Sequence, residues 1–516
     1  MSALGNLVVP IFSSFLGLFA LLTLIKMLHK LWWIPTRMQY LMSLKGIKGP
    51  SYRFIHGNTK QILTMKKEAM EKPMSLSHNI FPKVQPHIES WVRTYGKNYM
   101  QWYGAEAQLV VTDPDLIKEI LNNKDRAFPK FEIEALVKKL LGDGLVNSEG
   151  EKWAKLRKLA NHAFHGESLK DMTPAMISGV EIMLERWKLY EGQEIEVFEE
   201  FRLLTSEVIS RTAFGNSYQK GKKIFDMLMR LALLTSNNAY KLRLPGTSNF
   251  FKTNDQIESD MLEIEIRNNI IEIIKERKEK VMNGKEDNFG SDFLGLLLKA
   301  HHDANVNQRI SVDNMIDECK TFYFAGQETT NTLLGWTIFL LAIYADWQEE
   351  VRKEVVSLFG HRNPNPDSFG KLKIMGMVFN ETLRLYPPVI TMTRKVEREV
   401  RVGNHILPAN LNLYISTLPP HHDPDIWGED VHSFKPERFS EGVAQATKSN
   451  PAAFFPFGMG PRNCVGSNFA ITESKIALCM ILQRYRFTLS PTYVHMPYQL
   501  ITLRPQHGIQ VLLQPL

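Results

Sequence analysis

Hydrophobic positions recur with helical spacing over most of this chain. One stripe of Leu and Ile runs through residues 258–282, with charged side chains at other positions. A much longer helical pattern covers residues 311–345, and at about 1.5 Å per residue it predicts a helix of about 50 Å. Another helix is expected from about Leu372 to the Pro387-Pro388 pair, because proline ends a helical pattern.

Strand-like stretches are fewer and shorter. They run from Gln108 to Thr112, from Val400 to Leu413 and from Ile501 to Leu513. The chain has no regular alternation of strands and helices, no internal repeat and no Gly/Ser-rich or Pro-rich linker. Its 516 residues would suffice for about three domains of ordinary size. We nevertheless expect one large unit of the α+β class, mainly α with small β-sheets.

The N-terminus carries the strongest hydrophobic signal. Its apolar run from Leu7 to Ile25 is 19 residues long, close to the ~20 that cross a bilayer as a helix. Two tryptophans and several basic residues follow the run, as is typical where a helix leaves a membrane: Lys26, Lys30, Trp32, Trp33, Arg37, Lys45 and Lys48. This order favours an uncleaved anchor over a signal peptide, which has its basic residues first, and over a buried core helix.

These features predict three parts of the chain. Residues 1–30 would form a single transmembrane anchor, residues 31–50 a basic, proline-containing hinge, and residues 51–516 the main body. Pro35 and the Gly49-Pro50 pair would separate the anchor from the body. Because positively charged flanks remain on the cytosolic side of a membrane, the body is expected to face the cytosol.

Composition narrows the classes of partner. The chain has 44% hydrophobic and 23% charged residues, which is ordinary for a globular protein. Its net charge of +7 suits a nucleic acid, an anionic membrane or an acidic protein. No nucleic-acid-binding motif supports the first, so no nucleic-acid partner is expected. The three cysteines, Cys319, Cys464 and Cys479, give no disulfide framework and indicate a reducing compartment.

One cysteine lies in an unusual segment. It reads Phe457-Gly458-Met459-Gly460-Pro461-Arg462-Asn463-Cys464-Val465-Gly466. The glycines and proline before Cys464 predict a tight, irregular loop. A helical pattern follows Gly466, and backbone N–H groups at a helix N-terminus favour a thiolate, the form that ligates iron. A buried cysteine in a glycine turn is the alternative. A dinucleotide-binding loop is excluded because Asn463 replaces its last glycine and no βαβ unit surrounds it.

The segment 457–466 resembles the haem-binding signature of the cytochrome P-450 family. Three further segments match motifs of that family in the same order along the chain. Ala325–Thr330 resembles its oxygen-activation motif, Glu381–Arg384 its E-x-x-R motif, and Pro436–Phe439 the arginine segment that joins it. The resemblance covers nearly the whole chain. It implies the cytochrome P-450 fold behind the anchor, haem b (iron protoporphyrin IX) as the cofactor, and Cys464 as the ligand of its iron.

The oxygen-activation motif places an acid and an alcohol in the middle of the long helix. In the family, Glu328 and Thr329 would relay protons to iron-bound oxygen, so both are candidate catalytic residues. Gly326, which costs about 1 kcal/mol relative to alanine inside a helix, would leave room for the macrocycle beside Ala325. Taken alone, a solvent-facing Glu and a Thr bonded back to its own helix would be the simpler interpretation.

Glu381 and Arg384 lie three residues apart and therefore share one face of a helix. An isolated pair of this kind is usually a surface ion pair. The apolar residues around it indicate instead a buried helix, where the pair would need a further partner such as Arg438. The resemblance implies that this trio fastens the haem-binding loop to the core, which is a structural role and not a catalytic one.

Haem carries two propionates, which need cations or donors when they are buried. Trp153 and Arg157 match the W-x-x-x-R pair of the family, Arg394 follows the Pro387-Pro388 turn, and Arg462 is close to the iron ligand. The candidate haem-binding residues are therefore Trp153, Arg157, Ala325, Gly326, Arg394, Phe457, Arg462, Cys464 and Gly466.

The resemblance implies a monooxygenase that inserts one atom of O2 into a C–H bond. The chain has no Rossmann fingerprint and no P-loop. Electrons are therefore expected from NADPH through a separate NADPH-cytochrome reductase. We expect this protein and the reductase to contact lipid of the same endoplasmic reticulum membrane. The segments 385–388 and 421–424 look like the plant clan that modifies terpenoids and hormones. The expected substrate is a lipophilic plant metabolite, with a terpenoid or terpenoid hormone among the candidates.

The segments expected to line the cavity are apolar with scattered Thr and Tyr, which suits a lipophilic molecule with a few oxygens. They are residues 128–147, 232–250, 322–325 and 389–393. Two other functions remain open at this point. One is a haem-thiolate isomerase or dehydratase without need of oxygen or reductase, against which the intact Glu328-Thr329 pair argues. The other is a haem sensor or carrier without catalytic activity.

Overall fold

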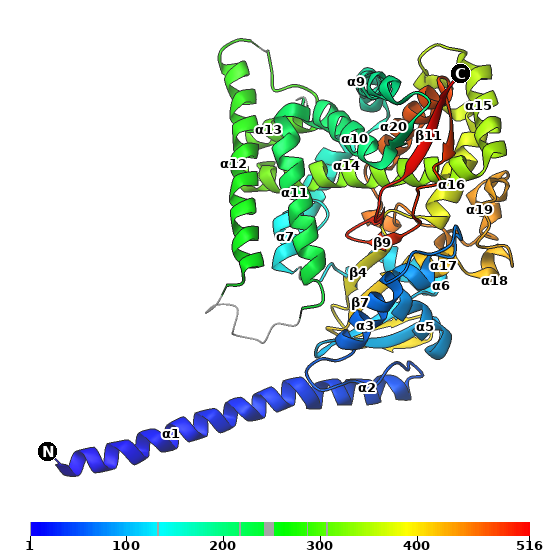
Figure 1. Ribbon diagram of the computed structural model, residues 1–516. Coiled ribbons are helices and arrows are strands. Elements are labelled where there is room, and N and C mark those ends of the chain that lie inside the picture. The colour runs from blue at the N-terminus through cyan, green and yellow to red at the C-terminus, as the bar shows by residue number, and fades with distance from the viewer. Residues whose placement is uncertain (1, 132–133, 216–217, 242–251, 286, 306–307) are drawn as a thin grey trace.

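The long helix expected at residues 311–345 runs through the middle of the molecule as α14 (Val312–Ile343) (Figure 1). The structure is a computed structural model that describes every residue except 1, 132–133, 216–217, 242–251, 286 and 306–307. α14 begins after Ser311, whose side chain accepts a hydrogen bond from the N–H of Asn314 at 3.0 Å. Most side chains of α14 are buried, so this helix is a central element of the core.

The body contains further helices, and several of them pack on α14. They are α3 (Thr59–Met70), α4 (Phe81–Val84), α5 (Pro86–Tyr95), α6 (Pro114–Leu121), α7 (Ala135–Leu141), α8 (Gly150–Ala163), α9 (Gly166–Trp187), α10 (Val197–Phe214), α11 (Tyr218–Asn238), α12 (Asn254–Met282), α13 (Phe293–His301), α15 (Ala345–Phe359), α16 (Lys373–Leu385), α17 (Leu418–His421), α18 (Pro424–Trp427), α19 (Val443–Ala446) and α20 (Ser467–Leu482). Among them, α10, α16 and α20 pack directly on α14. The helices expected at residues 258–282 and from Leu372 are α12 and α16, and α16 ends before Pro387 as expected.

The strands form small sheets. Their bounds are β1 (Asn98–Tyr103), β2 (Glu106–Val111), β3 (Glu194–Glu196), β4 (Thr391–Lys395), β5 (Val400–Val402), β6 (His405–Leu407), β7 (Asn412–Ser416), β8 (Tyr485–Leu489), β9 (Pro497–Gln499), β10 (Leu503–Pro505) and β11 (Gln510–Pro515). The largest sheet has the order β1-β2-β7-β4, in which only β2 and β7 are parallel. A second has the order β3-β11-β8, while β9 pairs with β10 and β5 with β6.

The largest sheet fixes the position of β4 at its edge. Thr393 of β4 pairs with Tyr414 of β7, which itself pairs with Val110 of β2. Successive side chains of a strand point to opposite faces. Met392 and Arg394 are two residues apart, and both reach the same cavity. The predicted fold, mainly α with small sheets, is confirmed.

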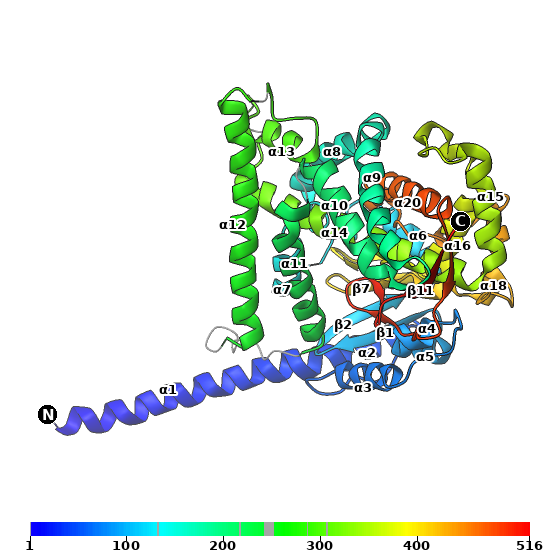
Figure 2. The same cartoon turned by 45° about the horizontal axis from the view of Figure 1, so that its top comes forward.

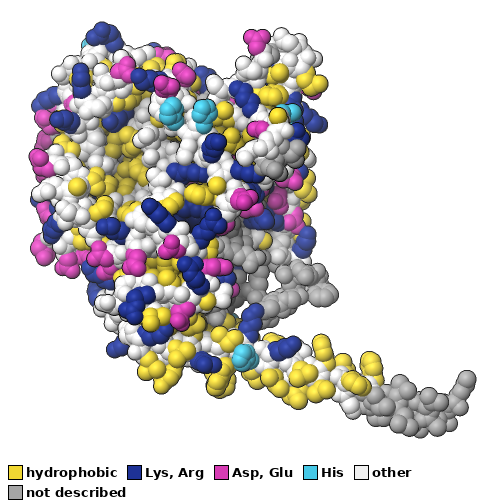
Figure 3. Space-filling view, turned by 180° about the vertical axis from the view of Figure 1, so that it is seen from behind, with side chains coloured by type: hydrophobic (Ala, Val, Ile, Leu, Met, Phe, Trp, Pro, Cys, Tyr) yellow, Lys and Arg dark blue, Asp and Glu magenta, His cyan; other side chains and the backbone are white. Residues whose placement is uncertain are grey.

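The N-terminal helix extends away from the body in two views (Figures 1 and 2). α1 (Ser2–Leu28) continues through a π-helical turn at His29–Trp33 into α2 (Ile34–Leu44). The stretch Ser14–Leu44 is long and apolar enough to cross a membrane, and none of its most apolar window is buried. Apolar side chains are visible along this helix and on the adjoining edge of the body (Figure 3).

Helix continues into the segment 31–50, where the sequence predicts a hinge. The chain stays helical as far as Leu44, and Pro35 does not interrupt it. Pro35 is the second residue of α2 and follows the π-helical turn, a place where a proline without an N–H is tolerated. The first residues outside a helix are those from Lys45 onward.

Candidate active site

The segment 457–466 forms a tight loop directly before α20. Gly458 and Gly460 have φ angles of +72° and +69°, a conformation that residues with a side chain rarely adopt. A Cβ atom at Gly460 would also lie 2.2 Å from the carbonyl oxygen of Leu121. The N–H of Cys464 donates to the carbonyl of Phe457 at 2.8 Å and closes the loop. Cys464 then faces a cavity.

Two opposing effects act on the thiol of Cys464. Burial raises its pKa, while the backbone N–H of Gly466 and the charge of Arg157 lower it. Burial is the largest of these effects, so the pKa of the thiol lies above its ordinary value. A bound metal ion deprotonates a coordinating thiol outright, so metal binding would favour the thiolate at this position.

The cavity lies between the loop 457–466 and the middle of α14. Its walls are largely apolar and come from α8, α10, α14, α20, β4 and the loops between them. The apolar side chains that line it include Leu145, Val146, Trp153, Phe164, Ile209, Phe322, Ala325, Leu333, Val389, Met392, Phe455, Phe457 and Phe469. A thiol facing apolar walls suits a flat hydrophobic macrocycle with a metal at its centre.

α14 presents one face to this cavity. Phe322, Ala325, Gly326, Thr329 and Leu333 line it, with the spacing of one helical face. The hydroxyl of Thr329 donates to the carbonyl of Ala325 at 2.8 Å. The bond back to the helix, which we considered as the simpler interpretation, is therefore present, and Thr329 also lines the cavity.

Glu328 does not line this cavity, in contrast to the expected position at the haem face. Along a helix it lies about 100° away from Thr329. Its buried carboxylate accepts a hydrogen bond from Thr502 at 2.6 Å and lies 3.3 Å from the guanidinium of Arg504. Burial raises the pKa of Glu328, and Arg504 and Thr502 counter this in part. Glu328 is thus a buried acid beside the cavity and not part of its wall.

Gly326 is required by the neighbouring helix α10. A Cβ atom at this position would lie 2.7 Å from Cδ1 and 2.8 Å from Cγ1 of Ile209. The missing side chain therefore lets α10 approach α14, and Ile209 in turn forms part of the cavity wall. Gly326 itself also lines the cavity, so the room expected there for the macrocycle stays a prediction.

The basic side chains of the cavity are Lys130, Arg157, Arg394 and Arg462. Burial lowers the pKa of Arg394 to about 10 and that of Lys130 to about 7, and neighbouring guanidinium groups add to both effects. Among the described residues whose charges shift these pKa values, Glu149 is the only carboxylate. Such an excess of buried positive charge fits the two propionates of haem.

The predicted pair on α8 reaches the same loop. The ring of Trp153 lies 4.3 Å from the guanidinium of Arg462. Arg157 donates to the backbone carbonyl of Asn463 at 2.6 Å and to its side-chain oxygen at 2.8 Å. Arg157, one of the predicted haem-binding residues, thus holds the residue that precedes Cys464.

Glu381 and Arg384 form a fully buried ion pair on α16. Arg384 donates from Nε and Nη2 to the two carboxylate oxygens of Glu381, each at 2.7 Å. Arg438, in the short helix Pro436–Phe439, lies 3.6 Å from Glu381 and donates to the carbonyl of Trp427 at 2.7 Å. The structure therefore brings the three predicted residues together.

Hydrogen bonds connect this trio with the loop that bears Cys464. Arg384 donates from Nη1 to the carbonyl of His421 at 3.0 Å, and Nε2 of His421 accepts the N–H of Phe455 at 3.2 Å. Burial lowers the pKa of His421 to about 3, and the charge of Arg384 contributes. The ring is therefore neutral and can accept this bond.

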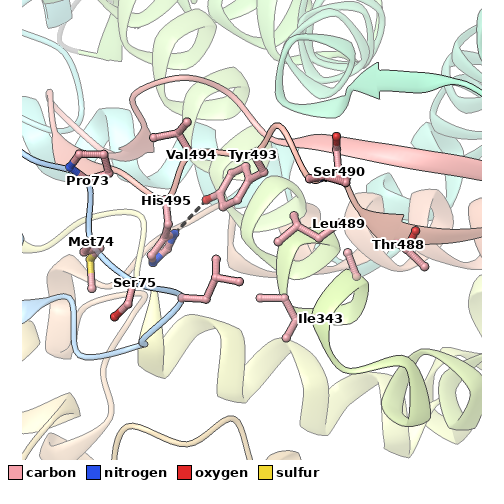
Figure 4. A pocket seen from close by; sticks show the side chains of 13 residues that line it. Pro73, Met74, Ser75, Ile343, Thr488, Leu489, Ser490, Tyr493, Val494 and His495 are labelled. Atoms are coloured by element: carbon pink, nitrogen blue, oxygen red, sulfur yellow. Dashed lines mark hydrogen bonds between the residues drawn. The ribbon is translucent and has the colours of Figure 1, made fainter.

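A second hollow lies on the surface and shares no lining residue with the cavity at Cys464 (Figure 4). It is lined by the segments 73–76, 342–343 and 488–495. The hydroxyl of Tyr493 and Nδ1 of His495 are 2.9 Å apart in its wall. Among the described residues that line it there is no cysteine, lysine or arginine. It therefore lacks both a thiolate ligand and cations for the propionates.

Three of the four segments expected to line the cavity contribute to it. They do so through residues of 128–147, 322–325 and 389–393. The fourth, 232–250, falls partly in residues 242–251, outside the described part of the chain. The sequence analysis did not identify Lys130, Thr502 and Arg504, because none of them lies in a recognisable motif. Thr502, for example, contacts Glu328 although the two are 174 residues apart in the chain.

Comparison of this sequence with known proteins shows that the chain belongs to the cytochrome P450 family. Residues 38–513 match the family model described as Cytochrome P450. The chain is 58% identical to Cytochrome P450 CYP749A22 of Panax ginseng, over 98% of this chain and 96% of that protein. It is 38% identical to the 7-deoxyloganic acid hydroxylase of Catharanthus roseus, over 95% and 96%. The solved structure of retinoic acid bound cyanobacterial CYP120A1 matches with a TM-score of 0.70 at 24% identity, covering 83% of this chain and 94% of that one.

Proposed function

Since this chain belongs to the cytochrome P450 family of haem-binding monooxygenases, we propose that it hydroxylates a C–H bond of a lipophilic plant metabolite. Electrons would come from NADPH through a separate reductase. The observation that carries this proposal is the position of Cys464, which faces an apolar cavity that also contains four basic side chains.

Each group of residues has a distinct part in this proposal. Cys464 would hold the iron, while Lys130, Arg157, Arg394 and Arg462 would bind the propionates, with Trp153 packed on Arg462. When bound, haem supplies the activation of O2, which the thiolate ligand promotes. The trio of Glu381, Arg384 and Arg438 would support the loop 457–466 from the core.

Glu328 and Thr329 would manage protons. Thr329 presents its hydroxyl at the cavity wall, where it can bond to a ligand in place of the carbonyl of Ala325. Glu328 lies behind that wall, and because burial raises its pKa it retains a proton more readily than an exposed carboxyl. Thr502 and Arg504 would fix its carboxylate.

A membrane location would bring substrate and reductase together. The apolar helix at the N-terminus would anchor the protein in the endoplasmic reticulum, with the body in the cytosol. The net charge of +7 would steer an acidic reductase to the body, and a shared membrane would raise their effective concentration.

The substrate class follows from the cavity and from one relative. Apolar walls with a few hydroxyls suit a lipophilic molecule with few oxygens. A relative named for the hydroxylation of 7-deoxyloganic acid makes a plant terpenoid the first class to test.

The decisive experiment is incubation with reductase, NADPH and a panel of terpenoids, followed by mass spectrometry of the products. A gain of one oxygen atom supports the proposal, and Cys464→Ser should abolish it together with the thiolate-type carbon monoxide spectrum. A rearranged or dehydrated product formed without reductase would favour an isomerase or dehydratase. A haem sensor or carrier would be favoured if no substrate gave a product and if Thr329→Val did not change the properties of the protein.

A further inference from the structure

The loop between α7 and α8, residues 142–149, forms part of the cavity wall. Leu145 and Val146 line the cavity. At its end, the carbonyl of Ser148 accepts a hydrogen bond from Arg462 at 2.8 Å, and Glu149 pairs with the same guanidinium at 2.6 Å. The path of this loop therefore affects the shape of the cavity.

Two side chains of α14 hold the 142–149 loop in place. The fully buried carboxylate of Glu318 accepts the backbone N–H of Leu145, and Thr321 donates to the carbonyl of Leu141 at 2.6 Å. The loop also lies directly against these groups. A Cβ atom at Gly144 would be 2.6 Å from Oε1 of Glu318 and 2.6 Å from Oγ1 of Thr321.

We propose that Glu318 is a positioning residue that sets the substrate-facing wall of the cavity by holding Leu145 against α14. This inference rests on the proposed function, because it takes the cavity to be the place where substrate binds. Glu318 lies on the same helix as Thr329, so one rigid element fixes both the wall and the candidate proton donor. A shift of Leu145 would change which molecules fit without altering the chemistry at Cys464.

The charge state of Glu318 provides a signature for this role. Burial raises its pKa to about 8. The backbone N–H of Leu145 and the charge of Lys152 oppose this rise, and the charge of Asp317 adds to it. Lys152 is itself paired with Asp143 at 2.8 Å, and the neighbouring thiol of Cys319 is buried with a raised pKa. Oε2 of Glu318 has no hydrogen-bond partner among the described residues. Above pH 8 this oxygen would share an unsolvated negative charge, which favours opening of the loop.

The test uses amide hydrogen exchange of the full-length holoprotein in detergent. In Glu318→Leu the N–H of Leu145 loses its acceptor, and its peptide should exchange about tenfold faster or more. Glu318→Gln keeps an acceptor oxygen and should protect the peptide as the unmodified protein does. The dissociation constant for ketoconazole, read from the Soret band, should rise about tenfold in Glu318→Leu. It should rise above pH 8 in the unmodified protein and stay constant with pH in Glu318→Gln.

A second variant keeps the test decisive if Glu318→Leu does not fold. Gly144→Ala places a methyl group against Glu318 and Thr321 and should displace the loop with the carboxyl intact. Gly166→Ala, where a Cβ atom meets nothing within 4 Å, is the matched control. Unchanged protection of Leu145 in folded Glu318→Leu or in folded Gly144→Ala would overturn the inference. Amide exchange needs neither substrate nor reductase. A failure to find oxygenated products would therefore contradict the proposed function without changing the outcome of the exchange experiment.

Discussion

Arg157 donates two hydrogen bonds to Asn463, one to its backbone carbonyl at 2.6 Å and one to its side-chain oxygen at 2.8 Å. Asn463 precedes Cys464, the proposed iron ligand, and Arg157 and Asn463 are 306 positions apart in the chain. The planar guanidinium reaches both acceptors at once. α8 therefore helps to determine where the ligand loop lies.

Replacing Arg157 by lysine should weaken haem retention. A lysine keeps the positive charge but cannot reproduce the two parallel bonds to Asn463. We expect about a tenfold loss of haem affinity, since one charged hydrogen bond contributes about 1.5–3 kcal/mol. The pyridine haemochrome assay on purified protein measures it. Lys158→Met, an exposed change on the same helix, should keep full haem content. Equal haem content in both variants would show that this contact is dispensable.

Loss of the buried carboxylate of Glu381 should be costly. Glu381→Ala leaves the guanidinium of Arg384 buried without its counter-charge, which costs about 3–5 kcal/mol. Urea denaturation should show this loss, and haem content should fall because His421 and the loop at Phe455 depend on Arg384. The control is Glu350→Gln, which breaks the exposed pair with Lys353 and should cost under about 1 kcal/mol. Normal haem loading of Glu381→Ala would refute the structural role.

Gly326→Ala should destabilise the protein although alanine is the better helix former. The added methyl would lie 2.7 Å from Cδ1 of Ile209, and overpacking of this kind costs about 1–3 kcal/mol. Thermal unfolding should show the loss, and the double change with Ile209→Val should restore part of it. Gly376→Ala on α16 meets nothing within 4 Å and should stabilise by up to about 1 kcal/mol. If Ile209→Val brings no recovery, α10 is not what requires the glycine.

Glu318 should make stability depend on pH. Its folded-state pKa, about 8, lies above the ordinary value of 4.5, so the folded protein binds the extra proton between these values. The resulting stabilisation is complete below pH 4.5 and is lost as pH rises to about 8, with an upper limit on the order of 5 kcal/mol. Urea denaturation at several pH values gives the free energy of unfolding as a function of pH. This free energy should fall with rising pH in the unmodified protein and not in Glu318→Gln. Parallel curves would contradict the prediction.

Removal of residues 1–28 should release the protein from membranes and keep the body folded. α1 contains the whole apolar run from Leu7 to Ile25, whereas Met42 of α2 is buried in the core with Met100. Removal of residues 1–44 should therefore cost stability as well, by about 2–5 kcal/mol for the buried methionine. Membrane sedimentation and thermal unfolding of the two shortened chains measure these effects. Continued membrane binding without residues 1–28 would indicate an additional membrane surface on the body.

The sequence by itself determined the elements whose signals are local. The long helix, the proline that ends α16, the apolar N-terminus and the glycine-rich loop at Cys464 depend on neighbouring residues, so their patterns can be read directly. The motifs also identified the trio of Glu381, Arg384 and Arg438, although only the fold shows that the side chains of Glu381 and Arg384 are fully buried.

Contacts between distant segments were decided by the tertiary structure. Three features depend on how helices and loops pack. They are the hydrogen bond between Glu328 and Thr502, the requirement for Gly326 beside Ile209, and the position of Lys130 in the cavity. A residue's own neighbours in the chain do not encode which distant side chain it will meet, because that depends on crossing positions set by the whole core. The same burial decides the pKa values of Cys464 and Glu318, which their local sequences do not reveal.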